Sequence, residues 1–543
     1  MNFDKLLEKY SNKGRKPYNP IMMYALIVYA NMKGIRSVDK IVELCERDIC
    51  FMYLAKGERP QRDAFYDFIN DRATIDVIED LHYQFINILK KEGYITLESL
   101  YIDGTKIEAN ANRYTFVWRG SINYNLSNLL VSIEEIYERY NKLIISNGYD
   151  EKYNLYEEKM FVIEGMDKVQ EIIKKNKERK LSKKKKISNN KIIKIDNICP
   201  LKLLKLQENL EKIANQEGIV FVYGRGHKKS ELQKIYEELE EKGKRLMKYK
   251  EAFEIMGDDR NSYSKTDLEA TFMRMKEDHM KNGQLKPAYN LQIAVENYFI
   301  IHSYISSDRT DYNTLIPIVE KHYEMTGIKL LDLTPDSGYC SEKNLKFLKE
   351  LGIRSYIKLQ EHEKKKTRKY YQQIGKHYNM KKIEKIKENG DKEIFYICHN
   401  NRKLEFIREE TKTQDGFSRT YKVYACNDCS GCEHKAKCLY RYDEKKDIDK
   451  NKAMKINENW EELKEESEKN VLSPEGIKKR QIRSIQTEGH FGDIKENDGI
   501  RKFNHRSKEK VYKETLFYIM GRNINKYHRF KNGMLKEFEP KIA

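Results

Sequence analysis

Long apolar runs are scarce in this sequence of 543 residues. Only 39% of the residues are hydrophobic and 35% are charged, which is polar for a globular protein and predicts long solvated helices beside a compact core. The run at residues 21–30 is about half as long as a bilayer requires. The opening segment MNFDKLLEKYSNKGRK has no apolar signal core. We therefore expect a cytoplasmic chain with no membrane partner.

Cysteine is also scarce, with nine residues in the chain. Without a secretory signal, these thiols are expected to be reduced or to bind a metal, and a disulfide framework is not expected. Five of them are dispersed and are predicted to be buried apolar residues: Cys45, Cys50, Cys199, Cys340 and Cys398.

The other four cysteines form the tight series Cys426-x2-Cys429-x2-Cys432-x5-Cys438, with His434 inside it. Four thiolates in a tetrahedron are the ligands of a structural zinc ion. The spacing is tighter than that of usual zinc fingers. It approaches an iron–sulfur pattern, but the last interval is five residues and no proline follows. Zinc is the favoured prediction, and an iron–sulfur cluster or no metal are the alternatives.

Acidic residues are outnumbered by basic ones, 85 to 104, which gives a net charge of +19. Such an excess predicts a polyanionic partner, because lysine and arginine that neutralise phosphates release counterions. A lysine-rich host proteome is the alternative reading, since net charge reports on partners and not on fold.

The first 96 residues have apolar positions at helical spacing, and Ser37 is a plausible N-cap. Basic residues are expected at the helix ends and turns, among them Arg15, Lys16 and Arg36. Short helices with basic turns are typical of DNA docking. A dimerisation or packing module is the alternative.

The remaining chain divides by composition. A β-prone stretch at 97–122 is predicted to begin the core. A helical or coiled-coil insertion at 123–260 follows, in which the lysine-rich run 177–186 is either a solvated loop or a phosphate contact. The later segments are a second part of the core at 261–360, an insertion with the cysteine cluster at 361–470, and a helical end of the core at 471–543.

The segment 261–360 carries the clearest strand pattern. A hairpin followed by alternating helices and strands predicts a mixed sheet with helices on both faces. The expected elements are strands at 289–295 and 299–306, a helix at 311–325, a strand at 330–333, a helix at 341–351 and a strand at 356–359.

Three carboxylates occupy positions typical of a nuclease sheet. Asp103 lies in a strand-like stretch, Asp336 follows a buried strand, and Glu488 lies on a C-terminal helix predicted to begin at Ser473. An acid at a strand end points into the crevice where open α/β sheets bind ligands. Carboxylate oxygens suit Mg²⁺, and two such ions activate a nucleophile and neutralise a leaving oxygen in phosphodiester cleavage.

The sequence resembles the DDE transposases of bacterial insertion sequences. The resemblance rests on GRKPYNPIMMYALIVYANMKGIRSVDKI, YIDGTKIEANANRYTFVWRG, SKTDLEATFMRMK, LKPAYNLQIAVE, LTPDSGYCSEKN and QTEGHFGDIKENDGIRKFNHRS, which follow in family order. It implies an RNase H-like core with a helical N-terminal domain. It also implies that Asp103, Asp336 and Glu488 are catalytic and bind two Mg²⁺ or Mn²⁺ ions.

The resemblance also extends to basic residues near the glutamate. Lys495 matches the family's lysine, and its seven-residue offset from Glu488 places both on one helical face. Arg483 matches the arginine before the glutamate, although five residues place it on another face of an ideal helix. Arg501 is a further candidate for DNA contact.

Other residues near the predicted site are open to two readings. Trp118 and Arg119 either stack on a splayed base or pack within the fold. Three further acids compete with the predicted ligands: Asp308, Asp332, expected as a strand-edge charge, and Glu108, expected nearby but not as a ligand.

The resemblance implies metal-dependent cleavage at transposon ends and strand transfer into target DNA. The implied partners are double-stranded DNA, as terminal inverted repeats and target, and a second copy of the chain in a homodimer on DNA. The protein would then associate with the nucleoid. The alternatives are a silent DNA-binding protein, a metal-dependent endonuclease without strand transfer, or a helical scaffold.

Overall fold

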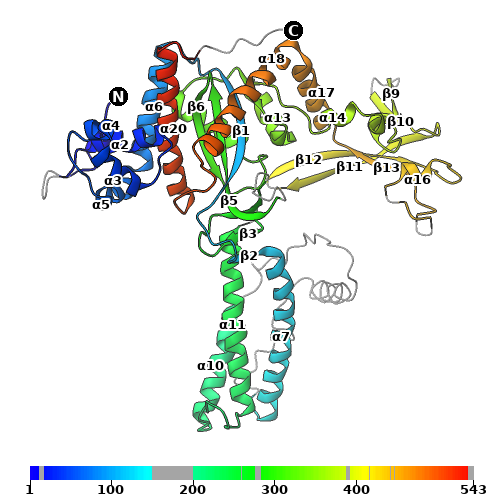
Figure 1. Ribbon diagram of the computed structural model, residues 1–543. Helices are drawn as coiled ribbons and strands as arrows, with labels where there is room; N and C mark the ends of the chain where they lie inside the picture. Colours follow the sequence, from blue (N-terminus) through cyan, green and yellow to red (C-terminus); the bar gives the residue numbers. More distant parts are fainter. Residues whose placement is uncertain are drawn as a thin grey trace.

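The structure is a computed structural model that describes residues 1–10, 17–149, 200–257, 260–275, 283–386, 392–414, 416–440, 442–444 and 447–535 (Figure 1). Arg15, Lys16, Cys199 and the lysine-rich run 177–186 lie outside these residues. Within them, no helix combines the length and the apolar character needed to cross a membrane.

A six-stranded mixed sheet lies at the centre of the molecule (Figure 1). β1 is its middle strand, antiparallel to β5 on one side and parallel to β7 on the other, and β7 is parallel to β8. β4 and β6 both pair antiparallel with β5 at successive positions along its outer edge. The strands are β1 (Ser99–Glu108), β4 (Thr271–Arg274), β5 (Leu285–Glu296), β6 (Phe299–Ser306), β7 (Asp332–Pro335) and β8 (Arg354–Ser355).

The largest apolar core joins the N-terminal helices to the sheet and to the helices that follow its strands. Helix starts follow their capping residues. Ser37 accepts the amide of Lys40, as the sequence predicted, and Asn19 caps the helix that opens with Pro20. The helices are α1 (Asp4–Leu7), α2 (Pro20–Met32), α3 (Val38–Arg47), α4 (Ile49–Leu54), α5 (Arg62–Asp67), α6 (Ile75–Lys91), α12 (Leu315–Thr326) and α13 (Glu342–Glu350), with a π-helical turn at Phe68–Arg72.

The C-terminal segment returns to the sheet and covers it. A second apolar core joins β1, β5 and β6 to residues 494–519. The amide of Asn523 bonds the backbone of Ile300 in both directions, at 2.9 and 2.8 Å, which fixes the last helix on β6. The elements are α17 (Glu458–Leu472), α18 (Pro474–Arg483), a π-helical turn η5 (Ser484–Glu488), α19 (Gly489–Gly492), a second π-helical turn η6 (Asp493–Asn497) and α20 (Lys508–Lys531).

Three long helices form a bundle that projects from the sheet, in the segment where the sequence predicted a helical insertion (Figure 1). They pack around their own core of leucine, isoleucine and tyrosine side chains, among them Tyr137 and Leu206. The short strands β2 (Phe116–Trp118) and β3 (Ser262–Ser264) pair at its base. The helices are α7 (Arg119–Ser146), α10 (Pro200–Gln216) and α11 (Glu231–Met256).

A second, antiparallel sheet of five strands projects in a different direction from the bundle, to the right in Figure 1. Its order is β13-β12-β11-β10-β9, and it carries the cysteine cluster at one end. The strands are β9 (Lys381–Ile386), β10 (Lys392–Ile397), β11 (Lys403–Gln414), β12 (Phe417–Cys426) and β13 (Ala453–Ile456). The short helices around them are α14 (His362–Lys365), α15 (Arg368–Tyr371) and α16 (Lys435–Cys438).

The strand predicted at 356–359 differs from the structure, because β8 ends at Ser355. From Ser355 onward the backbone carbonyls accept hydrogen bonds from side chains of α17: Ser467 donates to the carbonyl of Ile357 at 2.7 Å, and Asn470 donates to that of Ser355 at 3.3 Å. The apolar run is buried, as predicted, but it is covered by a helix and does not extend the sheet.

Candidate active site

Asp103 and Asp336 come from adjacent parallel strands. β1 and β7 are paired up to Ile102 and Pro335. Asp103 is the next residue of β1, and Asp336 follows the end of β7 with its backbone still extended. Two residues that follow a directly opposed pair in parallel strands point to the same face of the sheet. The tertiary structure therefore brings together two acids that lie 233 residues apart in the sequence.

The carboxylate of Asp103 is largely buried and bonded on both oxygens. Its Oδ1 accepts the amide of Gly104 at 2.8 Å. Its Oδ2 lies 2.9 Å from Nη1 of Arg483 and 3.3 Å from the hydroxyl of Thr487. Burial raises the pKa of Asp103 above its usual range and the charge of Asp336 adds to the rise, while Arg483 opposes it. The two aspartates therefore carry more negative charge than Arg483 neutralises.

Arg483 and Glu488 are separated by a π-helical turn, η5. A π-helix bonds residues five apart, so the five-residue offset that separates two faces of an ideal α-helix corresponds to roughly one turn here. The π-helical turn therefore places Arg483 and Glu488 about one turn apart, which differs from the ideal α-helix expected from the sequence. Arg483 contacts the first aspartate, and Glu488 is exposed at the end of the same turn.

Glu488 and Lys495 line one cavity of about 570 Å³ beside β1. Gly104, the neighbour of Asp103, also lines it. The wall carries seven basic side chains against four acidic ones, which favours an anionic ligand. The basic residues are Lys106, Arg113, Lys286, Arg309, Lys495, Arg501 and Lys502, and the acidic ones are Glu108, Asp311, Glu488 and Glu496.

A buried amide network lies behind the aspartate pair. Gln292 faces Gly104 across β1 and β5, and a Cβ at Gly104 would overlap its side-chain amide. Gln292 donates to Asp311 at 2.9 Å and accepts a hydroxyl from Tyr339. Neither Asp311 nor Gln292 was predicted from the sequence as a site residue. The sequence signal that could have identified Gln292 is its position within a largely apolar strand.

Asp311 lies near the aspartate pair. Burial raises the pKa of the Tyr339 phenol well above its usual value, and the charges of Asp311, Asp103 and Asp336 add to that rise. The charges of three aspartates therefore act on one buried hydroxyl. Asp311 is also held by Asn290, whose amide donates to it at 2.7 Å.

Two of the competing acids have partners of their own. Glu108 is buried and bonded to Arg113 at 2.8 Å, with Lys286 at 3.4 Å. Asp332 binds Lys479 at 2.9 Å and the hydroxyl of Ser99. Asp332 is the first residue of β7, and its charge is paired within the protein. The backbone amide of the third, Asp308, donates to the hydroxyl of Ser306 at 2.9 Å.

The residues predicted for DNA contact are dispersed. Arg36 pairs with Glu514 at 2.7 Å, beside the C-terminal segment. The ring of Trp118 packs against Phe116 and Phe272, which is the packing alternative. Arg119 donates to the carbonyl of Arg260 at 2.9 Å. Arg501 lines the cavity and pairs with Glu496 at 2.8 Å.

Among the residues that the structure describes, no three His, Cys, Asp or Glu side chains already converge on a metal position. Asp103 and Asp336 nevertheless suit a hard cation as a pair, because their mutual repulsion would be relieved by a positive charge between carboxylate oxygens. Glu488 does not complete a preformed three-carboxylate group with them.

Two segments of the chain match known protein families. Residues 397–528 match a family described as a transposase DDE domain, and residues 1–71 match one described as a transposase domain (DUF772). These matches support a DDE transposase of the insertion-sequence type, as the sequence predicted. The matched ranges include Glu488 and Lys495 but neither aspartate. No curated protein and no solved structure gave a match.

Proposed function

We propose that this chain cuts DNA at transposon ends and joins the ends to target DNA. The observation that carries the proposal is the pair formed by Asp103 in β1 and Asp336 just past the adjacent parallel strand β7, beside a basic cavity lined by Glu488 and Lys495. The central sheet would be the RNase H-like core that the family resemblance implies. The flanking bundle and second sheet would be insertions into it.

In this proposal Asp103, Asp336 and Glu488 would hold two Mg²⁺ or Mn²⁺ ions. When bound, such ions lower the pKa of a nucleophile and neutralise the leaving oxygen of a phosphodiester. Arg483 holds the Asp103 carboxylate in place, and the amides of Gly104 and Ser337 orient the two aspartates. A structural zinc ion at the cysteine cluster would have no part in this chemistry.

The basic wall of the cavity would bind the DNA backbone. Lys495 would contact the phosphate next to the scissile bond, and Arg501 and Lys502 would neutralise its neighbours. Hydrolysis leaves a 3′-hydroxyl at the transposon end. That hydroxyl then attacks a target phosphodiester, so one P–O bond forms as another breaks. Holding two ends at once favours a homodimer on DNA.

Cleavage of a labelled duplex that carries the flanking ends tests the proposal. Wild type is compared with Glu488→Gln, with Mg²⁺ or with EDTA. Glu496→Gln is the matched control, because it removes an equal charge from the wall of the same cavity. We expect metal-dependent nicking at the end that is lost in Glu488→Gln and retained in Glu496→Gln, with end binding preserved in both.

The other outcomes separate the alternatives. Equal cleavage by wild type and Glu488→Gln would show that Glu488 is not the catalytic glutamate. Tight end binding by wild type with no cleavage, under several metals and salt concentrations, would favour a silent DNA-binding protein. Nicked ends that are never joined to a target plasmid would favour an endonuclease without strand transfer.

A further inference from the structure

We propose that Cys398 is one of four thiolate ligands of a structural zinc ion, together with Cys426, Cys429 and a fourth cysteine from residues 432–438. The site lies at the end of the second sheet and does not depend on the proposed catalysis. It changes the ligand set that the sequence suggested, because Cys398, expected there as a buried apolar residue, becomes a ligand.

The strand register brings Cys398 to the cluster. Tyr396 in β10 lies opposite Leu404 in β11, and Leu404 lies opposite Cys426 in β12. Directly opposed residues share a face of a sheet, and so do residues two apart in one strand. Cys398 is two residues beyond Tyr396, so it lies on the same face of the sheet as Cys426. The same apolar cluster includes Cys426 and Cys429, with Cys398 packed against it.

Backbone amides already point at two of the sulfurs. The amide of Arg402 lies 3.3 Å from Sγ of Cys398, and the amide of Lys452 lies 3.3 Å from Sγ of Cys429. An N–H group directed at sulfur favours the thiolate, which is the form that binds zinc. A cysteine that serves only as an apolar side chain needs no such donor.

Lys452 ties the cysteine loop to the same group of thiols. Its backbone amide lies 3.3 Å from Sγ of Cys429, and its Nζ donates to the carbonyl of Cys438 at 3.2 Å. Thiolates held close together require a cation, and a tetrahedral zinc ion with four thiolate ligands supplies one.

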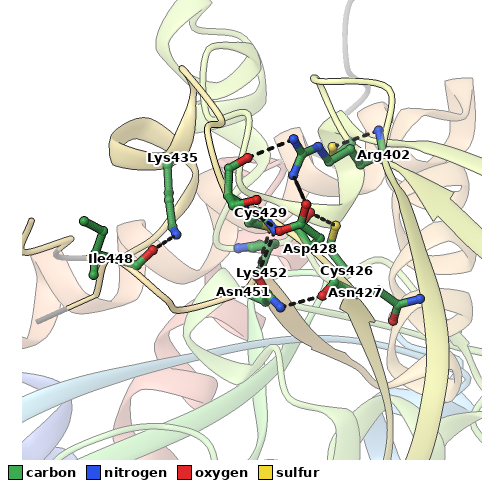
Figure 2. A network of polar contacts seen from close by, with 11 residues as sticks. Arg402, Cys426, Asn427, Asp428, Cys429, Lys435, Ile448, Asn451 and Lys452 are labelled. Atoms are coloured by element: carbon green, nitrogen blue, oxygen red, sulfur yellow. Dashed lines mark hydrogen bonds and ion pairs between the residues drawn. The ribbon is translucent and has the colours of Figure 1, made fainter.

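The backbone around the thiols is held in place by the protein itself (Figure 2). The guanidinium of Arg402 donates to the carbonyls of Asp428 and Ser430, at 2.5 and 2.9 Å, and so ties the β10–β11 turn to the cysteine loop. From the other side, the side chain of Asn451 accepts the amide of Cys429 at 2.9 Å. The described cysteines do not yet converge on a metal position, so binding would require their side chains to turn on this fixed backbone.

Protection of thiols from alkylation in the full-length wild-type protein tests the proposal. The protein is purified with zinc under reducing conditions, its metal content is measured, and it is alkylated before and after chelation. Mass spectrometry then identifies the modified residues. We expect about one zinc per chain and protection of Cys398, Cys426, Cys429 and one of Cys432 and Cys438 until the chelator is added.

Variants provide the second measurement. Cys398→Ser should lose the zinc, and Co²⁺ substituted at the site should lose its four-thiolate absorption spectrum. Cys340→Ser, which changes a buried cysteine in the central sheet region, should retain both. Protection of Cys426, Cys429, Cys432 and Cys438 with Cys398 alkylated before chelation would overturn the ligand set. A wild-type protein that holds no zinc, even when zinc is added, would overturn the site.

Discussion

The guanidinium Nη1 of Arg483 lies 2.9 Å from Oδ2 of Asp103, across 380 residues of sequence. Both side chains are about five-sixths buried. Removing one partner of a buried pair leaves the other charge uncompensated, which is costly. Arg483 therefore fixes the position of Asp103 and limits how strongly burial favours its neutral form.

The first prediction concerns the pH dependence of stability. The pKa of Asp103 is raised in the folded state, so its contribution to stability is present below its ordinary pKa and is lost as pH rises through the folded value. The free energy of unfolding of wild type minus that of Asp103→Asn should fall as pH rises above about 4. Urea unfolding in EDTA measures the difference. In an Arg483→Gln background the fall should extend to higher pH.

Glu43 provides a control of opposite sign. A hydrogen bond from Lys40, at 3.0 Å, lowers the pKa of Glu43. The corresponding difference for Glu43→Gln should therefore rise with pH, by a small amount, because the pair is exposed. A difference for Asp103→Asn that also rises with pH would contradict the buried and charge-crowded environment described for this residue.

The second prediction concerns three buried histidines between α6, β6 and α12. Nδ1 of His302 lies 2.8 Å from the hydroxyl of Tyr83, and its Nε2 lies 2.8 Å from Nδ1 of His322. Nε2 of His82 lies 2.9 Å from the carbonyl oxygen of Ile301. Burial lowers the pKa of His82 and of His322 to about 4 and that of His302 well below its ordinary value. Stability from such groups is present above their ordinary pKa and is lost as pH falls toward the folded value.

The protein should therefore lose stability steeply between about pH 6.5 and pH 4. A pKa lowered to about 4 corresponds to on the order of 3 kcal/mol per histidine at the acidic end of that range. His322→Asn should be less stable at pH 7 but should show a shallower loss toward pH 4. Thermal melts over this range measure the slope. His528→Gln, at an exposed histidine, is the control, and an unchanged slope in His322→Asn would refute the prediction.

The third prediction concerns the contact between α2 and α20. A Cβ at Gly521 would lie 2.6 Å from the amide nitrogen of Met32 and 2.9 Å from the carbonyl oxygen of Val28. Backbone atoms cannot move aside cheaply, so Gly521→Ala should destabilise the protein by about 1–3 kcal/mol. Gly243→Ala is the matched control. It lies inside α11 with its nearest neighbour at 3.9 Å, and it should stabilise the protein by up to about 1 kcal/mol.

Urea unfolding of the two variants measures both effects. If Gly521→Ala is as stable as wild type, the close approach of the C-terminal helix to the N-terminal helices is not as described. A loss of stability in both variants would instead indicate a general effect of alanine at helical glycines.

The local sequence determined much of the fold. Alternating and apolar patterns located β5 and β6, and caps such as Ser37, Ser341 and Ser473 located helix starts. These features follow from neighbouring residues alone, because capping and side-chain periodicity act within a turn or a strand. Family motifs then supported the transposase class, which the family matches confirmed.

What only the tertiary structure decided depends on residues that are distant in the chain. Strand pairing set Asp103 beside Asp336, and the π-helical turn allowed Arg483 to reach Asp103 while Glu488 faces the cavity. Pairing of β10, β11 and β12 brought Cys398 to the cysteine cluster. Spacing along the sequence fixes which residues share one element, but register and packing between elements fix which side chains meet, and no local pattern encodes those contacts.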